Sequence, residues 1–324
     1  MNKTRYALAF IGCYMLTAFV AVFRWLLLLN VQYTYMDNEF PYWIQQKDYV
    51  RTAGSKSEIL FLGDSRMKSC IIPDQLCDNA YNLAVGGGTA MEMYYSLAEY
   101  IRHHPMPEKV FAGFGSFHYA REDCYKSRTL YFHFLTLHQE LESLLVAYRT
   151  RMVPLKKMQE ELLDLLKYEL LFPEKYSAAC INSKFKRSEF NKKKYAENQA
   201  ARGHMLFGKK DGSAGLNTEA HSRHFAPHPR GEYYLRRLVS LCKKNDIPLY
   251  LIQLPMNEPS WDAVAKNEYY KEFQAYVEAF AQEHDITAET EIPRYSPALF
   301  GDPSHVNAKG AAEYTRQIKE RYGL

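Results

Sequence analysis

The chain has 324 residues, 47% of them hydrophobic and 24% charged, which is typical of a globular protein with a sizeable core. Its length allows one large domain or two small ones. A net charge of +4 is too small to indicate a nucleic-acid partner, and none is expected. The positive charge is local, because the segment Lys184–Arg237 holds 13 Lys/Arg and 5 Asp/Glu while the rest of the chain sums to −4.

The N-terminus predicts a membrane anchor. Tyr6–Phe23 is 18 residues without a charge, and the residues after Arg24 are apolar again. The run therefore reaches the roughly 20 residues that a spanning helix needs, and no convincing cleavage site follows it. Lys3 and Arg5 precede the span, whereas acidic residues follow it, so the positive-inside rule places the remainder of the chain outside the cytoplasm. We expect residues 1–30 to be a single-pass anchor in the cytoplasmic membrane and residues 31–55 to be a linker.

The six cysteines do not indicate a disulfide framework. Cys13 lies in the predicted span, and the five that remain would leave at least one free thiol. Cys70 and Cys77 are close enough in sequence for a bridge, but they are equally typical of small buried hydrophobic residues. The chain has no Cys-x-x-Cys pair, so a zinc–thiolate site is not expected.

Beyond the anchor, short apolar runs alternate with helical patterns. Five runs predict strands: 59–62, 80–85, 109–115, 248–254 and 287–292. Four segments predict helices: 89–103, 231–245, 263–284 and 308–322. This alternation is typical of an α/β fold with a parallel sheet covered on both faces, where ligands bind beyond the carboxyl ends of the strands. Four groups of residues fall at those ends: Ser65, Gly86–Gly88, Gly115–His118 and Pro255–Asn257.

Residues 120–230 interrupt the alternation. Leu137–Leu171 has helical spacing of Leu and Val, and Lys184–Lys210 is basic and irregular. We therefore expect a largely helical and loop insertion between the third and fourth strands of a domain that spans residues 56–324. Within it, Lys192, Lys193 and Lys194 would either attract an acidic polymer or only keep a long loop solvated.

Two short motifs indicate nucleophilic catalysis. Gly63-Asp64-Ser65 closes the first predicted strand, where Ser65 is either a nucleophile or only the cap of the next helix. Asp302 and His305 are three residues apart, just before the last helix. That spacing lets a carboxylate orient one imidazole nitrogen while the other faces a nucleophile. Each motif alone is common, but their order along an α/β chain, with a glycine cluster between them, is much less frequent by chance.

These residues resemble the SGNH, or GDSL, hydrolase family over about residues 56–118 and 231–324. Three blocks of the family are matched in order by Gly63-Asp64-Ser65, Gly86–Gly88 and Asp302-x-x-His305. The resemblance implies a flavodoxin-like three-layer sandwich in which Ser65 is the nucleophile, His305 the base and Asp302 its orienting acid. The backbone N–H groups of Ser65 and of Gly86 or Gly87 would then bind the oxyanion.

One block of the family is missing. The stretch Phe114–His118 lacks the family's Gly-x-Asn-Asp, in which the Asn donates to the oxyanion. Either Ser116 or Asn257 substitutes, or the machinery is specialised or weakened, since loss of one donor can cost about 10²–10³ in rate. A membrane-anchored branch shares this departure, namely proteins resembling the D-alanyl-teichoic-acid biosynthesis protein and the alginate O-acetylation proteins. That branch implies an extracytoplasmic domain and a multipass membrane acyltransferase as partner.

Other candidate sites are less favoured. His221, His224 and His228 have metal-ligand spacing, but neighbouring prolines disfavour a continuous helix, so no metal is expected. No Lys-Ser/Thr follows the glycine cluster, so a nucleotide is not expected, and no cofactor is implied. Arg66 would either bind an anionic group of the substrate or lie solvated at the start of the helix.

Together with the predicted anchor, the resemblance implies a bacterial envelope protein whose outward-facing domain transfers or hydrolyses acyl esters on a surface polysaccharide or related glycopolymer. Two alternatives stay open. One is a non-catalytic SGNH-like subunit that binds polymer or scaffolds a membrane acyltransferase. The other is an ordinary secreted esterase with an uncleaved anchor.

Overall fold

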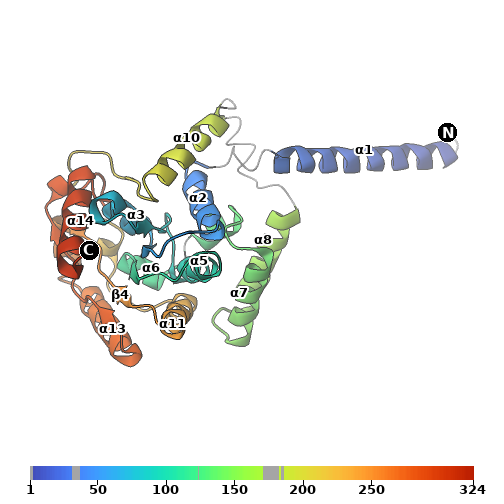
Figure 1. Ribbon diagram of the computed structural model, residues 1–324. Helices are drawn as coiled ribbons and strands as arrows, with labels where there is room; N and C mark the ends of the chain where they lie inside the picture. The colour runs from blue at the N-terminus through green and yellow to red at the C-terminus, as the bar shows by residue number, and fades with distance from the viewer. Residues whose placement is uncertain (1–2, 31–36, 123, 171–181, 184–185) are drawn as a thin grey trace.

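The computed structural model describes residues 3–30, 37–122, 124–170, 182–183 and 186–324. It consists of a mixed α/β body and one long N-terminal helix, α1 (Lys3–Asn30), which extends away from the body (Figure 1). The stretch Lys3–Phe23 of α1 is long and apolar enough to span a membrane, and 0% of it is buried against the body. The structure therefore contains the helix that a single-pass anchor requires.

Five parallel strands form the central sheet in the order β2-β1-β3-β4-β6. Their bounds are β1 (Ile59–Gly63), β2 (Ala80–Asn82), β3 (Lys109–Gly113), β4 (Leu249–Leu251) and β6 (Thr287–Ala288). All five residues of β1 are buried, as expected for a parallel strand that is covered on both sides. The predicted α/β class with a parallel sheet is confirmed.

Several strands are shorter than the apolar runs that predicted them. The run 80–85 is a regular strand only to Asn82, and 287–292 contributes two residues. The run after β2 nonetheless stays beside β1, because the N–H groups of Leu83 and Val85 donate to the carbonyls of Phe61 and Gly63 at 2.8 and 3.1 Å. This pairing brings the glycine cluster to the carboxyl end of β1.

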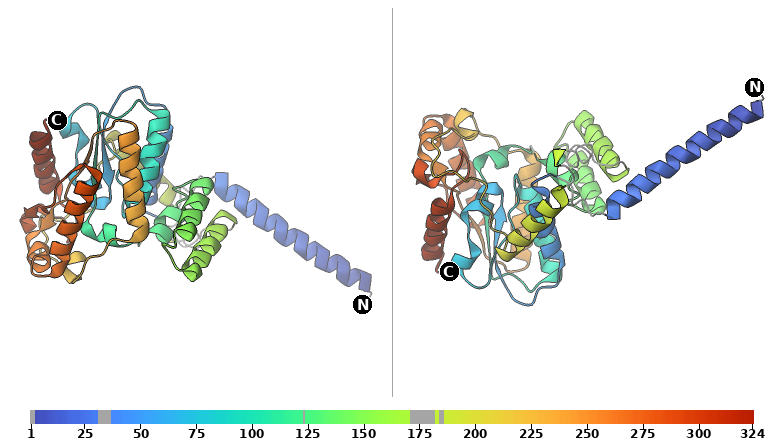
Figure 2. Two further views of the ribbon diagram at one scale, coloured as in Figure 1. Left: turned by 90° about the horizontal axis from the view of Figure 1, so that it is seen from below. Right: turned by 90° about the horizontal axis from the view of Figure 1, so that it is seen from above.

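Helices pack on both faces of the sheet (Figure 2). Leu60 and Leu62 face one core, which contains residues of α2 (Phe40–Arg51), α5 (Ala90–His103), α11 (Pro229–Lys244) and α13 (Glu268–His284), together with residues of the insertion. Phe61 faces the other core, which contains residues of three helices: α3 (Ser65–Cys70), α4 (Pro73–Leu76) and α14 (Ala308–Tyr322). Successive side chains of a strand point to opposite faces, so β1 contributes to both cores.

Two expected elements differ in the structure. The expected helix over 263–284 is two helices, α12 (Glu258–Val264) and α13, because the side chain of Asn257 caps an earlier start and the backbone is extended at Asn267. The expected linker over 31–55 contains α2, whose Trp43 is fully buried, so residues 40–51 belong to the body. Cys70 and Cys77 are free thiols, and no bridge joins them.

The insertion between β3 and β4 contains helices and irregular chain, with no strand among its described residues. Its elements are α6 (Ser116–Ala120), a π-helix (Tyr125–Leu130), α7 (Leu137–Arg149), α8 (Leu155–Leu170), α10 (Arg187–Ala200) and a short 3₁₀ helix (Glu219–His221). After α10 the chain runs along the edge strand, where the N–H of Asn82 donates to the carbonyl of Arg202 at 3.0 Å. A small second sheet pairs β5 (Met256–Asn257) with β7 (Arg294–Tyr295), before the 3₁₀ helix Pro297–Leu299.

Lys68 is fully buried on α3. Its Nζ donates to the carbonyl of Ala84 at 3.0 Å and to that of Gly203 at 2.7 Å, and it thereby ties the glycine cluster to the insertion. Burial lowers the pKa of Lys68 to about 7. A neutral amine still has two N–H donors, enough for both hydrogen bonds.

We expect the wild-type protein to gain about 2 kcal/mol of stability relative to Lys68→Met between pH 7 and pH 9. Folded Lys68 loses its proton near pH 7, whereas the unfolded chain keeps it up to about pH 10.4. The unfolded state therefore binds more protons in this window, and stability rises with pH. Urea unfolding of both proteins at the two pH values measures the difference. A difference that does not change with pH would contradict the lowered pKa.

Candidate active site

Ser65 is the first residue of α3, directly beyond the end of β1. The cap of this helix is Asp64, whose Oδ1 accepts the backbone N–H groups of Arg66 at 2.8 Å and Met67 at 3.4 Å. Because Asp64 performs the capping, the hydroxyl of Ser65 is not used for it. The interpretation of Ser65 as only a helix cap is therefore wrong.

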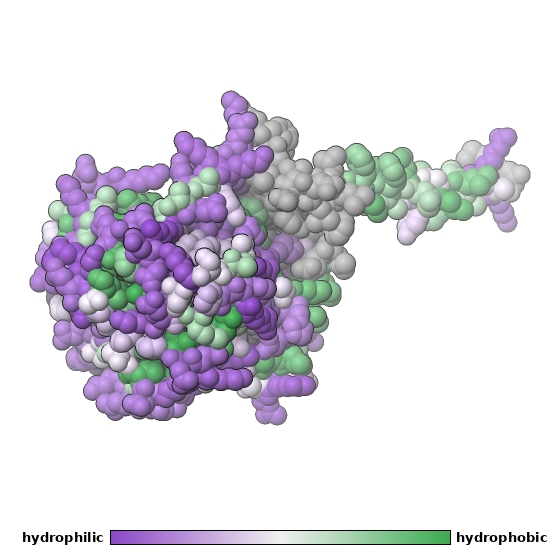
Figure 3. All heavy atoms as spheres, in the orientation of Figure 1, coloured by the Kyte–Doolittle hydropathy of each residue, from purple (hydrophilic) through white to green (hydrophobic). Residues whose placement is uncertain are grey.

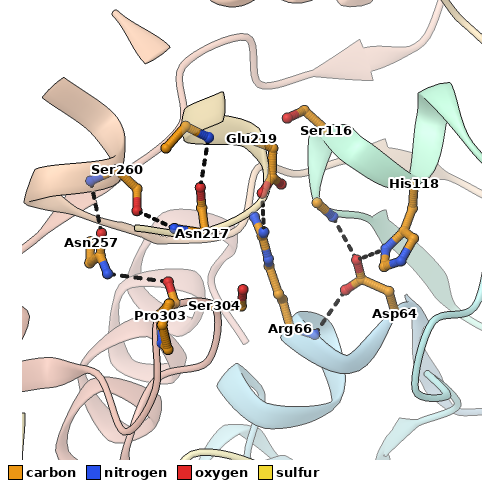
Figure 4. Close-up of polar contacts among 12 residues, drawn as sticks. Asp64, Arg66, Ser116, His118, Asn217, Glu219, Asn257, Ser260, Pro303 and Ser304 are labelled. Atoms are coloured by element: carbon orange, nitrogen blue, oxygen red, sulfur yellow. Dashed lines mark hydrogen bonds and ion pairs between the residues drawn. The ribbon is translucent and has the colours of Figure 1, made fainter. Parts of the chain in front are cut away.

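The second oxygen of Asp64 fixes the turn after β3 (Figure 4). Its Oδ2 accepts the N–H of Gly115 at 2.8 Å and lies 2.5 Å from Nδ1 of His118. Burial alone would raise the pKa of Asp64, but the charges of His118 and Arg66 and these hydrogen bonds outweigh it and lower the pKa to about 2. The carboxylate thus stays ionised and holds two strand ends in one arrangement.

Ser65, His305 and Asp302 form a continuous hydrogen-bonded chain. Nε2 of His305 lies 2.7 Å from Oγ of Ser65, and Nδ1 of His305 lies 2.8 Å from Oδ2 of Asp302. A carboxylate can only accept, so Nδ1 carries the proton and the lone pair of Nε2 faces the serine hydroxyl. In this tautomer His305 can accept the proton of Ser65, which is the arrangement that a serine nucleophile and its base require.

Asp302 is itself oriented by the backbone. Its Oδ1 accepts the N–H groups of Ser304 and His305, both at 2.8 Å. Burial would raise the pKa of Asp302, but the hydrogen bonds from His305 and Ser304 hold it below its usual value. Asn307 ends the loop by capping α14, accepting the N–H groups of Lys309 and Gly310 at 3.1 Å each. The acid and the base are therefore positioned by one short loop.

The insertion supplies a neighbour of the base that the sequence did not indicate. The ring of Phe207 lies 5.1 Å from the ring of His305, centroid to centroid. Beside it the backbones of Gly208 and Gly301 are in close contact, since a Cβ on Gly301 would lie 2.2 Å from the carbonyl carbon of Gly208. The chain that returns from α10 thus packs directly against the His305 loop.

The glycine cluster lies next to the end of β1. A Cβ on Gly88 would come within 3.0 Å of the carbonyl oxygen of Gly63, and one on Gly86 would lie 3.5 Å from the ring of Phe207. Gly87 has a φ of +74°, which favours glycine. The predicted oxyanion residues Gly86 and Gly87 therefore form a turn beside the same aromatic ring that contacts His305.

An ion pair supports this turn from outside. Arg128 donates to the carbonyl of Gly86 at 3.1 Å and to a carboxylate oxygen of Glu39 at 2.8 Å. Burial raises the pKa of Glu39, although Arg128 opposes the shift. The residues that precede α2 and those of the π-helix thus meet at the glycine turn.

The two proposed substitutes for the missing oxyanion Asn differ, because the amide hydrogens of Asn257 are bonded to other groups whereas Ser116 keeps its own O–H as a donor. Ser116 accepts a hydrogen bond from the hydroxyl of Tyr269 at 3.0 Å. Asn257 caps α12 through Oδ1, and its amide nitrogen donates to the carbonyls of Gly215 at 2.8 Å and Pro303 at 3.2 Å. Asn257 therefore joins the insertion to the His305 loop as a structural residue.

Arg66 is a buried structural residue rather than a solvated one. Its guanidinium forms a 2.6 Å ion pair with Glu219, whose side chain is fully buried, and it packs against the backbone of Gly115 (Figure 4). The guanidinium that was expected to bind an anionic group of the substrate is therefore already paired with a carboxylate inside the protein.

The three lysines of the basic segment lie on α10. Lys192 and Lys193 are exposed, and Lys193 and Lys194 both pair with Glu197, at 3.8 and 2.6 Å. This shared carboxylate offsets part of their charge. Among the described residues, no group of three His, Cys, Asp or Glu side chains could hold a metal ion.

Comparisons with known proteins add little to this geometry. The model of an uncharacterised family matches residues 188–323, which is less than half of the chain. The match includes Asp302 and His305 but not Ser65. No curated protein matches the sequence.

Proposed function

We propose that this protein is a membrane-anchored SGNH-like enzyme that transfers or hydrolyses acyl esters on a bacterial surface polysaccharide. The observation that carries the proposal is the hydrogen-bonded chain Ser65–His305–Asp302 at the carboxyl end of a parallel sheet. The strand order β2-β1-β3-β4-β6 supports a flavodoxin-like sandwich, because it is the order of doubly wound folds of that type.

The proposed reaction has two steps. Oγ of Ser65 attacks the acyl carbonyl while Nε2 of His305 takes its proton, and the leaving alcohol then receives that proton as the acyl-enzyme forms. In the second step His305 takes the proton of a sugar hydroxyl or a water, whose oxygen attacks the acyl carbonyl. The bond between the acyl carbon and Oγ then breaks, and His305 returns the proton to Oγ of Ser65. Asp302 stays ionised and stabilises the imidazolium in both steps.

The oxyanion of each tetrahedral intermediate needs hydrogen-bond donors. The backbone N–H of Ser65, at the start of α3, and that of Gly86 or Gly87 are the donors we propose. The family's Asn donor is absent, because the chain has Gly115-Ser116 in its place. We therefore expect slower turnover than in a site with three donors.

That missing donor also favours a second candidate, a non-catalytic SGNH-like subunit that binds polymer or scaffolds a multipass membrane acyltransferase. Labelling with a fluorophosphonate separates the two functions, because the reagent reacts only with an activated serine. We expect wild-type protein to be labelled at Ser65. Polymer binding without labelling would instead support the non-catalytic subunit.

The proposed location is the cytoplasmic membrane with the body outside. Its support is α1 together with the charges of Lys3 and Arg5 ahead of the span. A reporter that is active only outside the cytoplasm, fused after Leu324, should be active in a bacterial host. Activity of only a cytoplasmic reporter at the same position would overturn both the topology and the surface substrate.

We further expect neutralisation of Lys192, Lys193 and Lys194 to weaken the binding of an acidic polysaccharide such as alginate by several-fold at low salt. Exposed charges act on a polyanion over about 10 Å at 0.1 M ionic strength, so the effect should vanish at high salt. Turnover of a small neutral ester should not change. The matched control neutralises exposed lysines on other helices: Lys243, Lys244 and Lys319. If both triple variants bind the polymer equally, the α10 lysines do not bind it and only keep this segment solvated.

A further inference from the structure

The helices α7 and α8 pack against each other, and each exposes an apolar stripe. On α7 the stripe is Leu137, Leu141, Leu145 and Tyr148, which are 47%, 46%, 46% and 56% exposed. On α8 it is Leu155, Leu162, Leu163 and Leu166, which are 58%, 40%, 65% and 46% exposed. Apart from the adjacent pair Leu162 and Leu163, the members of each set are three, four or seven residues apart, which places each set on one side of its helix.

These stripes adjoin apolar residues of the same helices that are buried. The inward face of α7 contains Leu144 and Ala147, and that of α8 contains Leu165 and Tyr168, all of them buried. Each helix therefore has a wide apolar face, of which one part is buried and the other part is exposed. Apolar residues gather over these two helices at the edge of the body nearest to α1 (Figure 3).

The hairpin lies where the chain arrives from the anchor. Phe40, at the start of α2, contacts Phe132 at 5.5 Å between ring centroids, and Trp43 contacts Phe134 at 4.9 Å. The segment with these two phenylalanines leads directly into α7, and α8 packs on the π-helix before it. Both views in Figure 2 show the hairpin on the side of the body from which α1 extends.

The short segment between α1 and the body limits how far the body can lie from a membrane that α1 crosses. Asn30 ends α1, and Asp37 is the first described residue of the body, so seven residue steps span at most about 25 Å. If α1 crosses the bilayer, Asp37 stays within about 25 Å of the end of the span, and the hairpin is on the side of the body that faces the anchor. This local concentration favours the bilayer over a second protein as the occupant.

The charges around the stripes fit an anionic lipid surface. Arg149, Arg151 and Lys156 are exposed at the connection between α7 and α8, beside Tyr148 and Leu155. Tyrosine is enriched at membrane interfaces, and basic side chains are attracted to anionic headgroups. An apolar stripe bordered by basic residues is typical of helices that lie in the plane of the interface.

We propose that the α7–α8 hairpin lies on the outer surface of the membrane, with its Leu stripes inserted among anionic lipids. This inference rests on the proposed single-pass anchorage by α1. The π-helix beside the hairpin carries Arg128, which contacts Gly86 and Glu39. Docking of the hairpin would therefore fix the orientation of the glycine turn, and of the candidate active site beside it, relative to the membrane.

Photo-crosslinking of the full-length protein tests this contact. A benzophenone amino acid replaces Leu163 on the stripe or, as the matched control, Glu278, which is exposed on α13. Both proteins are reconstituted in vesicles of phosphatidylethanolamine and phosphatidylglycerol. We expect at least fivefold more lipid adduct from position 163 than from position 278. Adding Leu141→Gln and Leu145→Gln should reduce the adduct at position 163 several-fold.

Two further measurements keep the inference separate from the proposed anchorage. If alkaline carbonate washes the wild-type protein from the vesicles, the anchorage itself fails. If the protein resists carbonate but positions 163 and 278 give equal lipid adducts, only the proposed membrane contact of the hairpin is overturned. Crosslinks from position 163 to another polypeptide in native membranes, without lipid adducts, would overturn it in favour of a protein partner.

Discussion

Replacing Ser65 with alanine should lower turnover of an activated acetyl ester by at least about 10³-fold and remove fluorophosphonate labelling completely. The variant loses only the hydroxyl that lies 2.7 Å from Nε2 of His305. The cap of α3 is Asp64, so the helix should form as before. Initial rates with a chromogenic acetyl ester measure the effect. Circular dichroism verifies that the fold is retained.

The matched control is Ser69→Ala, one turn later on the same helix. The hydroxyl of Ser69 donates to the backbone carbonyl of Ser65 at 2.8 Å. It is not hydrogen-bonded to His305. We expect Ser69→Ala to keep most of the activity. If wild type and Ser65→Ala turn over the ester equally, Ser65 is not the nucleophile.

His305→Ala should cost about as much as Ser65→Ala, and the double variant should be hardly slower than either single variant. Residues that act as one unit are strongly non-additive, because removing one of them already disables the others. Asp302→Asn should lose no more than His305→Ala, since the base itself remains. If the losses of Ser65→Ala and His305→Ala multiply in the double variant, the two residues do not act as one unit.

The sequence was sufficient to predict the parallel sheet and the contact between Asp302 and His305. Apolar runs at strand length identify buried parallel strands, and Asp302 and His305 are so close in sequence that one loop orients both. Strand ends were less predictable. The regular part of β2 stops at Asn82, whose side chain binds the carbonyls of Met67 and Ile71 at 3.0 and 3.1 Å.

The surroundings of the candidate site were not predictable, because they depend on contacts between distant segments. Glu219 and Phe207 lie in the insertion, far in sequence from the residues they contact, and neither has a motif. The role of Arg66 was also not predictable from the sequence. Its position next to Ser65 is typical of a substrate-binding residue, and only the fold reveals that its guanidinium donates a hydrogen bond to Glu219.

We therefore expect the ion pair of Arg66 with Glu219 to contribute mainly to the free energy of unfolding. Arg66→Met keeps the length of the side chain but leaves the carboxylate of Glu219 buried and unpaired. Breaking a buried pair on one side costs about 3–5 kcal/mol, so we expect a loss of this size in urea unfolding of the full chain in detergent. Arg316→Met is the control, because its ion pairs with Glu313 and Glu320 are exposed. It should cost less than about 1 kcal/mol.

The double variant Arg66→Met/Glu219→Leu distinguishes the charge from the packing. Replacing both partners of a buried ion pair with apolar residues is often close to neutral, so it should recover most of the stability lost in Arg66→Met. The double variant should also be labelled at Ser65, since Asp64 and the backbone of α3 are unchanged. If the double variant folds but Ser65 is not labelled, the guanidinium acts on the reaction itself. If it is as unstable as Arg66→Met, the buried charge of Glu219 is not the cause of the loss.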